Sequence, residues 1–248
     1  IIPLLTLGFG VPMHYAVGAS LISVIGTSSG AAVAFVKEGF TNMRIGMFLE
    51  IATTIGAVVG ALVSGILNPN TIGIIFASIL LLTVVLNLRG KEDHQESLVK
   101  GSLEHKLKLY GTFPDKGVVK SYSARNTIPG FFMMIFAGAM SGLLGIGSGA
   151  LKVLAMDNMM KLPFKVSTTT SNFMIGVTAV ASSLIYFQRG EIIPYIAAPV
   201  LVGIVVGSFI GSKTLMASKT KKLKVFFAIV ITALSIYMMY NGIANNFK

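Results

Sequence analysis

Residues 11–30 read VPMHYAVGASLISVIGTSSG, and residues 162–181 read LPFKVSTTTSNFMIGVTAVA. The second stretch repeats the first at a shift of 151 residues. The same shift aligns small and polar residues well beyond these stretches: Pro12 with Pro163, Ser20 with Ser171, Thr27 with Thr178, Gly39 with Gly190, Gly56 with Gly207 and Gly60 with Gly211. Two copies of an apolar unit in one chain predict a pseudo-symmetric membrane protein whose working site lies where the copies meet.

Composition indicates a bilayer environment. Hydrophobic residues make up 54% of the chain and charged residues 12%, whereas soluble domains carry about 25% charged residues. About 20 helical residues cross a bilayer core, so we expect spans over 14–36, 43–65, 70–88 and 223–243, and more broken ones over 128–151, 166–187 and 193–212. Because backbone polar groups in lipid must bond internally, the sequence predicts an all-α, multi-pass (polytopic) membrane protein with two homologous multi-helix repeats around a central site.

Charge and cysteine content narrow the function classes. The net charge is +11 and there is no cysteine. Lys and Arg in short cytoplasmic loops account for such a charge through the positive-inside bias, so nucleic acid is not an expected partner. Without cysteine, neither disulfides nor thiolate metal sites are available, and His14, His94 and His105 form no pattern for metal binding or catalysis. We expect no metal, no cofactor and no enzyme activity.

Three segments follow from the repeat and the distribution of charge. The first transmembrane repeat covers 1–88, the second covers 127–248, and 89–126 between them is a charged hydrophilic linker. The first half of the linker is predicted as a charged surface helix and the second half as turn or extended chain. A solvated connection between the two halves accounts for the linker, and a regulatory or partner-binding role is the alternative.

The first repeat is expected to be incomplete at its N-terminal end. At the shift of 151 residues, Ile1 falls on Lys152, and the second repeat has residues 127–151 before that point. We therefore expect an intact protein to carry a matching glycine-rich helix ahead of Ile1.

The run GIGSG at 145–149 interrupts an apolar segment. Each glycine destabilises a helix by up to about 1 kcal/mol relative to alanine, so the helix is predicted to break here. An unwound backbone at membrane depth occurs only inside protein or beside a water-filled cavity, and broken helices present N–H groups to anions. Gly145, Gly147, Ser148 and Gly149 are thus candidate anion ligands. Close helix packing through small residues is the alternative.

Hydroxyl side chains form a second candidate group. The run STTTSN at 167–172 opens the next predicted helix, offering caps and spare donors. Ser171 and Thr178 share a helix face, and the first repeat has Ser20 and Thr27 at the equivalent positions. Such stripes also join helices to each other. Because both copies keep polar groups at equivalent positions, Ser20, Thr27, Ser171 and Thr178 are candidate substrate-binding residues, and Asn172 is added from the run at 167–172.

Charged residues within the spans are a third signal. A charge at the bilayer centre costs about 2.5–3.5 kcal/mol on insertion scales, so such residues tend to be functional or paired. Glu50 is a candidate carrier of a coupling proton, and pairing with Arg44 or Lys37 near the interface is the alternative. Lys152 is a candidate for holding the charge of an anion, and snorkelling to the headgroups is the alternative.

In the order and spacing of its motifs, the chain resembles the TauE/SafE family of sulfite-exporter-like anion permeases. The resemblance rests on the glycine run followed by Leu162-Pro163, on Thr170-Ser171-Asn172, on YFQRGEI at 186–192 and on Gly203, Gly207 and Gly211. VP at 11–12, GASL at 18–21 and VKEG at 36–39 echo it in the first copy. The resemblance covers essentially the whole chain except the linker. It implies a prokaryotic plasma membrane and transport of a small anion, typically sulfite, a sulfonate or a related organic acid.

The residues and the resemblance together predict a secondary transporter that moves a small anion by alternating access between two repeats. An anion channel is one alternative. A non-transporting membrane subunit or sensor acting through the 89–126 linker is an alternative of a different class. The glycines at 203, 207 and 211 can pack helices within one chain or between two copies, which leaves a homo-oligomer open.

Overall fold

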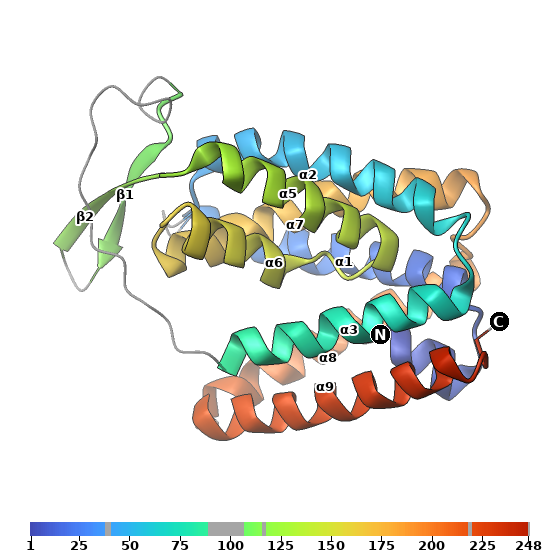
Figure 1. Cartoon of the computed structure of the whole chain (residues 1–248). Coiled ribbons are helices and arrows are strands. Elements are labelled where there is room, and N and C mark those ends of the chain that lie inside the picture. The colour runs from blue at the N-terminus through green and yellow to red at the C-terminus, as the bar shows by residue number, and fades with distance from the viewer. Residues whose placement is uncertain (38–40, 89–106, 116–117, 218–219, 248) are drawn as a thin grey trace.

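The computed structural model describes residues 1–37, 41–88, 107–115, 118–217 and 220–247. Helices dominate it (Figure 1). In chain order the elements are the π-helical turn η1 (Leu4–Gly8), α1 (Met13–Lys37), α2 (Met43–Ser64), α3 (Pro69–Leu88), β1 (Tyr110–Asp115), β2 (Val118–Ser123), α5 (Thr127–Leu144), α6 (Gly149–Leu154), the π-helical turn η2 (Ala155–Met159), α7 (Phe164–Gln188), α8 (Pro194–Ala217) and α9 (Thr220–Ile243).

Several of these helices are suited to a membrane. By length and composition α2, α5 and α7 can cross one, and shorter apolar helical segments cover Pro69–Val85, Pro194–Gly207 and Ala228–Ile243. Large apolar side chains are exposed along one face of α2, at Ile51, Ile55, Val59 and Leu62. In water such a stripe is costly, whereas lipid solvates it. The chain is a multi-pass helical membrane protein, as its composition predicts.

The same local structure recurs at positions related by the 151-residue shift. Adding the shift to both bounds of α1 gives the bounds of α7, and adding it to those of η1 gives those of η2. The first residues of α2 and α3 map onto the first residues of α8 and α9. Because π-helical turns are rare, the recurrence of one at the matching position shows that the shift relates elements as well as residue types.

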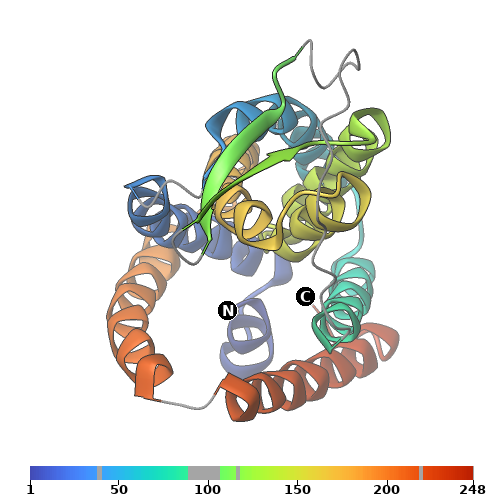
Figure 2. The ribbon, with the colours of Figure 1, turned by 90° about the vertical axis from the view of Figure 1, so that its left-hand side faces the viewer.

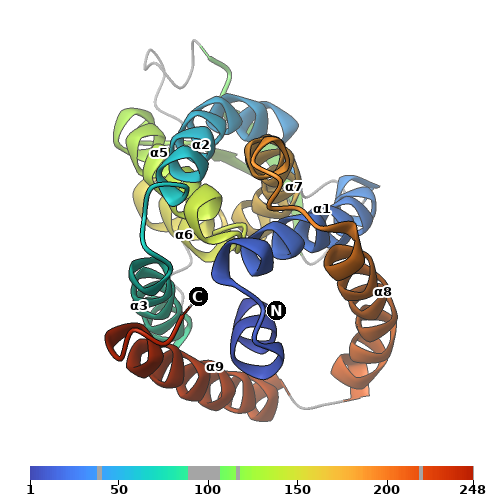
Figure 3. The ribbon, with the colours of Figure 1, turned by 90° about the vertical axis from the view of Figure 1, so that its right-hand side faces the viewer.

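Helices from both halves of the chain form the centre of the molecule. α2 packs against α5 and α7, and α1 packs against α7 and α8. α3 and α9 pack against each other toward the outside, and α8 forms another outer wall (Figure 3). The interior is therefore lined by α1 and α2 from the first half and by α5, α6 and α7 from the second.

α2 and α5 approach so closely that their backbones touch. A Cβ added to Gly56 would overlap the carbonyl oxygen of Ile135 on α5, and one added to Gly138 would overlap that of Thr53 on α2. Gly60 and Gly142, four residues further along the same two helices, make the same close approach, and small residues at this spacing permit close helix crossings in membranes. The contact fixes α5, and with it the segment that follows α5, against the middle of α2.

The second half of the linker forms a β-hairpin. β1 and β2 pair antiparallel, with Tyr110 opposite Ser123, and Figure 2 shows the hairpin across one end of the helices. Its buried side chains, Leu109, Phe113 and Tyr122, share a core with residues of α2, α5, η2 and α7. The chain is extended here, as predicted, but it packs on the helices instead of standing in solvent. Residues 89–106, which carry the predicted charged helix, lie outside the described residues.

Candidate functional site

The glycine loop, residues 145–149, interrupts the helix where the sequence predicts a break. α5 ends at Leu144 and α6 begins at Gly149. The φ angles of Gly145 and Gly147 are 63° and 71°, and that of Ser148 is 42°. Glycine adopts this left-handed region without steric cost. A Cβ on Gly147 would also press on Ile175 of α7, so both conformation and space require glycine there.

Two serine hydroxyls bind the carbonyl oxygens at the ends of the glycine loop. Ser20 of α1 donates to the carbonyl oxygen of Gly145 at 2.8 Å. Ser171 of α7 donates to the carbonyl oxygen of Gly149 at 3.3 Å. These two serines, which the 151-residue shift aligns in the sequence, hold opposite ends of one loop.

Tyr186 of α7 binds the turn that leads into the loop, and sequence reasoning missed this residue. Its side chain is fully buried, and its hydroxyl lies 3.0 Å from the carbonyl oxygen of Gly142 and 3.2 Å from that of Leu143. The last carbonyls of a helix have no intrahelical partner. Tyr186 therefore supplies from another helix what α5 lacks at its C-terminus.

The N–H groups of the loop are less well satisfied than its carbonyls. The N–H of Gly145 donates to Ser141 at 2.8 Å, but those of Ile146, Gly147 and Ser148 have no hydrogen-bond partner within the described part of the chain. Gly147 and Ser148 are nevertheless buried. Buried backbone donors are almost always paired, and successive N–H groups in turns of this kind form concavities that bind anions. The carbonyls of Gly145, Ser148 and Gly149 are thus occupied, whereas three successive N–H groups of the loop are free within the described residues.

An acid and a base meet one turn beyond the loop. Lys152 of α6 has no solvent-exposed surface, and its Nζ lies 2.5 Å from Oγ1 of Thr178. The same hydroxyl lies 2.7 Å from Oε1 of Glu50, which also accepts from Thr54 at 3.3 Å. Oε2 of Glu50 is buried without a partner among the described residues. Three helices therefore bring opposite charges to one hydroxyl.

The structure places both charges in the interior, and their roles in anion binding and proton coupling stay predictions. Lys152 points into the protein and does not snorkel to the headgroups. Glu50 is bound to Thr178 in the interior and is not held at the interface. A buried charge of either sign is costly unless it is paired and hydrogen-bonded, and the Thr178 hydroxyl makes that pairing.

The remaining predicted residues lie outside this group or serve the backbone. Thr27 is exposed, and its hydroxyl donates to the carbonyls of Ser23 and Val24 in its own helix. The hydroxyl of Ser148 donates to the carbonyl of Ala137 at 2.6 Å. Asn172 contributes its backbone carbonyl, which accepts from Ser28 of α1 at 2.5 Å.

The hydroxyl run at 167–172 lies inside α7 and not at its cap. α7 begins at Phe164, and its N-cap is Pro163, which makes no side-chain cap bond. Thr168 and Thr169 donate to carbonyls one turn back in their own helix. The expectation that this run leaves spare capping donors is therefore not met for these two threonines.

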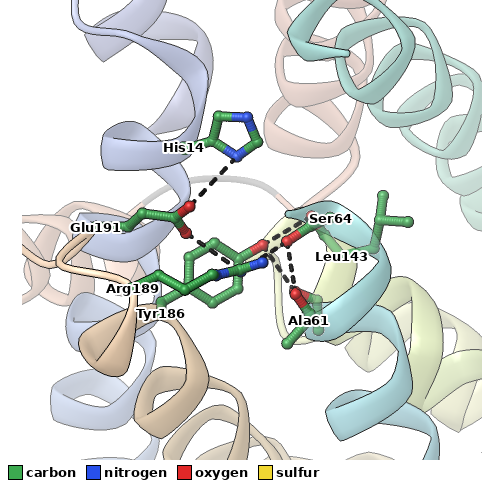
Figure 4. A network of polar contacts seen from close by, with 8 residues as sticks. His14, Ala61, Ser64, Leu143, Tyr186, Arg189 and Glu191 are labelled. Carbon is green, nitrogen blue, oxygen red and sulfur yellow. Dashed lines mark hydrogen bonds and ion pairs between the residues drawn. The ribbon is translucent and has the colours of Figure 1, made fainter. Parts of the chain in front are cut away.

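A cluster of charged and polar side chains lies beside Tyr186 (Figure 4). We call it the charged cluster: His14, Ser64, Arg189 and Glu191. Nη2 of Arg189 lies 3.0 Å from Oγ of Ser64 and 3.2 Å from Oε2 of Glu191. Nδ1 of His14 lies 4.0 Å from Oε1 of Glu191. The sequence identified the motif at 186–192 only through its resemblance to a family and predicted no structural role for it.

A buried break in a helix, an internal acid–base pair and helices able to cross a bilayer define a class: helical membrane transport proteins. Comparison with known families agrees with this class. The family model "Sulfite exporter TauE/SafE" matches residues 1–238. The chain belongs to the TauE/SafE family.

Relatives carry names of the same kind. The probable membrane transporter proteins YunE and YdhB of Bacillus subtilis (strain 168) are 27% and 26% identical to this chain, over 92% and 94% of its length and 81% and 89% of theirs. A probable membrane transporter protein of Xylella fastidiosa (strain 9a5c) is 23% identical over 94% of this chain and 82% of its own. No solved structure matches. Family and relatives support a role in membrane transport and not in catalysis.

Proposed function

We propose that this protein is a secondary transporter that moves a small anion by alternating access between its two repeats. The observation that carries the proposal is the glycine loop, in which three successive N–H groups, at Ile146, Gly147 and Ser148, are free within the described residues while the carbonyls at both ends of the loop are occupied. Unpaired, buried donors favour an anion and disfavour a cation. A water-excluded position strengthens each of these interactions relative to water.

The repeat supports the alternating-access part of the proposal. Each copy supplies one serine to the loop, Ser20 from the first and Ser171 from the second. α1 packs on α8 just as α7, its counterpart at the 151-residue shift, packs on α2. Two copies with such equivalent contacts can exchange roles, which lets a site between them open first to one side of the membrane and then to the other.

Sulfite is the substrate we favour, with sulfonates, related organosulfur anions and organic acid anions next. The family is described as sulfite exporters, and a small oxoanion offers several acceptor oxygens to a short row of N–H donors. Lys152 follows these donors by one turn of chain, and its buried ammonium group supplies a positive charge to the same region of the interior.

Proton coupling follows from the acid–base pair. With Glu50 ionised, the charge of Lys152 is balanced through Thr178. Protonation of Glu50 leaves a net positive charge beside the glycine loop and so favours the anion. α5 carries no charged residue. His14, Arg44 and Lys165 lie in the first turns of α1, α2 and α7, Lys37 ends α1 and Asp157 lies on η2, whereas Glu50 and Lys152 share the hydroxyl of Thr178. We therefore assign the coupling to Glu50 and Lys152.

Anion binding to the purified protein tests this function. Thermal unfolding is measured with sulfite, sulfate, thiosulfate, acetate and a sulfonate, because a ligand that binds the native state stabilises it by about 2.7 kcal/mol at 100 times its Kd. Selective stabilisation by one anion is expected, and Ser20→Ala with Ser171→Ala should weaken it. Ser78→Ala, whose hydroxyl bonds within α3, is the matched control.

Flux into proteoliposomes separates a transporter from the alternatives. Saturable uptake that depends on a pH gradient is expected of the coupled transporter. A conductance that rises with concentration without saturating would favour a channel. If no anion stabilises the protein and no flux is detected, the anion-site model is wrong.

A further inference from the structure

We propose that Tyr186 is a positioning residue for the glycine loop, and that the charged cluster acts on the loop through it. The importance of Tyr186 for transport rests on the proposed function. Its effect on the glycine loop can be tested without any anion. It assigns a role to the motif at 186–192, which the anion site itself does not use.

The first step is the contact between Tyr186 and α5. Its hydroxyl holds the carbonyls of Gly142 and Leu143, which lie directly before the glycine loop. Gly142 also contacts the backbone of α2, because a Cβ there would overlap the carbonyl oxygen of Ala57. Tyr186 and α2 therefore both hold the end of α5, and the glycine loop starts from this fixed end.

The second step is the contact between Tyr186 and the charged cluster. The guanidinium of Arg189 lies 4.8 Å from the centre of the Tyr186 ring, within the range of a cation–π interaction. The backbone N–H of Glu191 donates to the carbonyl of Tyr186 at 2.9 Å. Figure 4 shows the ring of Tyr186 lying between Glu191 and the Ser64 end of α2.

The third step is the connection of the cluster to the first half of the chain. Ser64 is the last residue of α2 and His14 is the second residue of α1. Both meet side chains that directly follow the end of α7, Ser64 that of Arg189 and His14 that of Glu191. A Cβ on Gly18 of α1 would press on the carbonyl oxygen of Glu191. If the two halves move relative to each other, these contacts at one end of the helices must change, and Tyr186 carries that change to the loop.

A thiol reporter in the loop tests the link directly. The sequence has no cysteine, so Ile146→Cys introduces a unique thiol. Its rate of modification by a maleimide is measured in nanodiscs, alone and combined with Tyr186→Phe, Arg189→Lys or both. Tyr240→Phe on α9, an exposed position, is the matched control, and thermal unfolding verifies that each variant is folded.

Loss of the Tyr186 hydroxyl should speed modification about fivefold, the shift that one net hydrogen bond of about 1 kcal/mol gives. Arg189→Lys should also speed it, and the double variant should be no faster than Tyr186→Phe, because the cluster acts through the tyrosine. The proposal is wrong if Tyr186→Phe leaves the modification rate unchanged. It is also wrong if the increase in the double variant equals the product of the increases in the two single variants. Should Tyr186→Phe not fold, unchanged modification in Arg189→Lys overturns it instead.

Adding sulfite to the same samples keeps the two proposals apart. Protection of the Ile146→Cys thiol by sulfite supports the anion site, and its absence counts against that site alone. Faster modification in Tyr186→Phe supports the positioning role whether or not sulfite protects. If sulfite protects, its Kd should rise by up to about fivefold in Tyr186→Phe, for the same loss of about 1 kcal/mol, while Tyr240→Phe leaves it unchanged.

Discussion

Oγ1 of Thr178 on α7 lies 2.7 Å from Oε1 of Glu50 on α2, although 128 residues separate them in the sequence. Lys152 reaches the same hydroxyl from α6. One neutral side chain thus stands between a buried acid and a buried base, and each charge depends on the other for its place in the interior. Several consequences can be measured.

Lys152→Met should destabilise the protein by about 3–5 kcal/mol, because it leaves Glu50 as an uncompensated buried charge. Adding Glu50→Gln to Lys152→Met should restore most of this loss, since the double variant buries no charge. Thermal unfolding in detergent measures both effects. If the losses of the two single variants simply add in the double variant, the two residues are not coupled.

The same pair of variants separates stability from binding. Lys152→Met with Glu50→Gln should be folded but should not bind sulfite, because the ammonium group is gone. A double variant that recovers both stability and anion affinity would show that Lys152 has a purely structural role.

Glu50→Gln alone should lower stability, because it leaves Lys152 as an unpaired buried charge. The folded protein should still transport the anion but lose its dependence on a pH gradient, because the amide retains the acceptor toward Thr178 and cannot carry a proton. Uptake into proteoliposomes with and without an imposed gradient measures this. Glu50→Asp, which keeps the charge and loses one methylene, is the matched variant and should stay gradient-dependent. Equal gradient dependence in Glu50→Gln and the parent would exclude Glu50 as the coupling residue.

Gly56→Ala should destabilise the protein by about 1–3 kcal/mol, because the new Cβ overlaps the backbone of α5 and forces the two helices apart. Gly203→Ala on α8 is the control. No described atom lies within 4 Å of a Cβ at that position, so helix propensity should make it neutral or stabilising by about 0.5–1 kcal/mol. Similar effects at both glycines would argue against the close crossing of α2 and α5.

Asn42 joins the hairpin to the helices, and Asn42→Asp should loosen that junction. Its Oδ1 caps α2 by accepting from the N–H groups of Arg44 and Ile45, while its Nδ2 donates to the hydroxyl of Tyr122 at 2.8 Å. Aspartate keeps the cap and loses the donor. Hydrogen exchange should therefore speed up in residues 110–123 and stay unchanged at the start of α2.

Asn42→Ala removes both functions of this side chain, so it should also destabilise α2 by about 0.5–2 kcal/mol. Fast exchange at the start of α2 in Asn42→Asp would mean that the cap depends on the hairpin contact, contrary to this assignment.

Local sequence signals predicted part of this site. Three glycines within five residues of an apolar segment indicated the helix break, because helix propensity is a local property. The cost of placing a charge within a bilayer similarly identified Glu50 and Lys152, each from its own position in the sequence. Their meeting at Thr178 depends on how α2, α6 and α7 are rotated about their axes, and that rotation is fixed by packing between segments far apart in the sequence.

The hydroxyls illustrate where the sequence misleads. Ser20 and Thr27 lie on one predicted face of α1, yet Ser20 reaches the loop while Thr27 is exposed and bonds within its own helix. A seven-residue spacing places two side chains on one face, but a partner helix or loop covers that face over a limited length. Tyr186 could not be singled out as a partner of the glycine loop, because a buried aromatic residue in a helix is usually part of the core.

The glycine loop offers its donors from the backbone, and this affects how the protein can change over evolutionary time. Backbone N–H groups are the same whichever side chains flank them, so the preference for negative charge survives extensive replacement of neighbours as long as the turn keeps its shape. If the proposed anion site is right, relatives that share about a quarter of their residues with this chain and keep the loop would differ in which anion they accept while still rejecting cations. Substrate choice could diversify through small changes in the dimensions of the loop, without rebuilding its electrostatics.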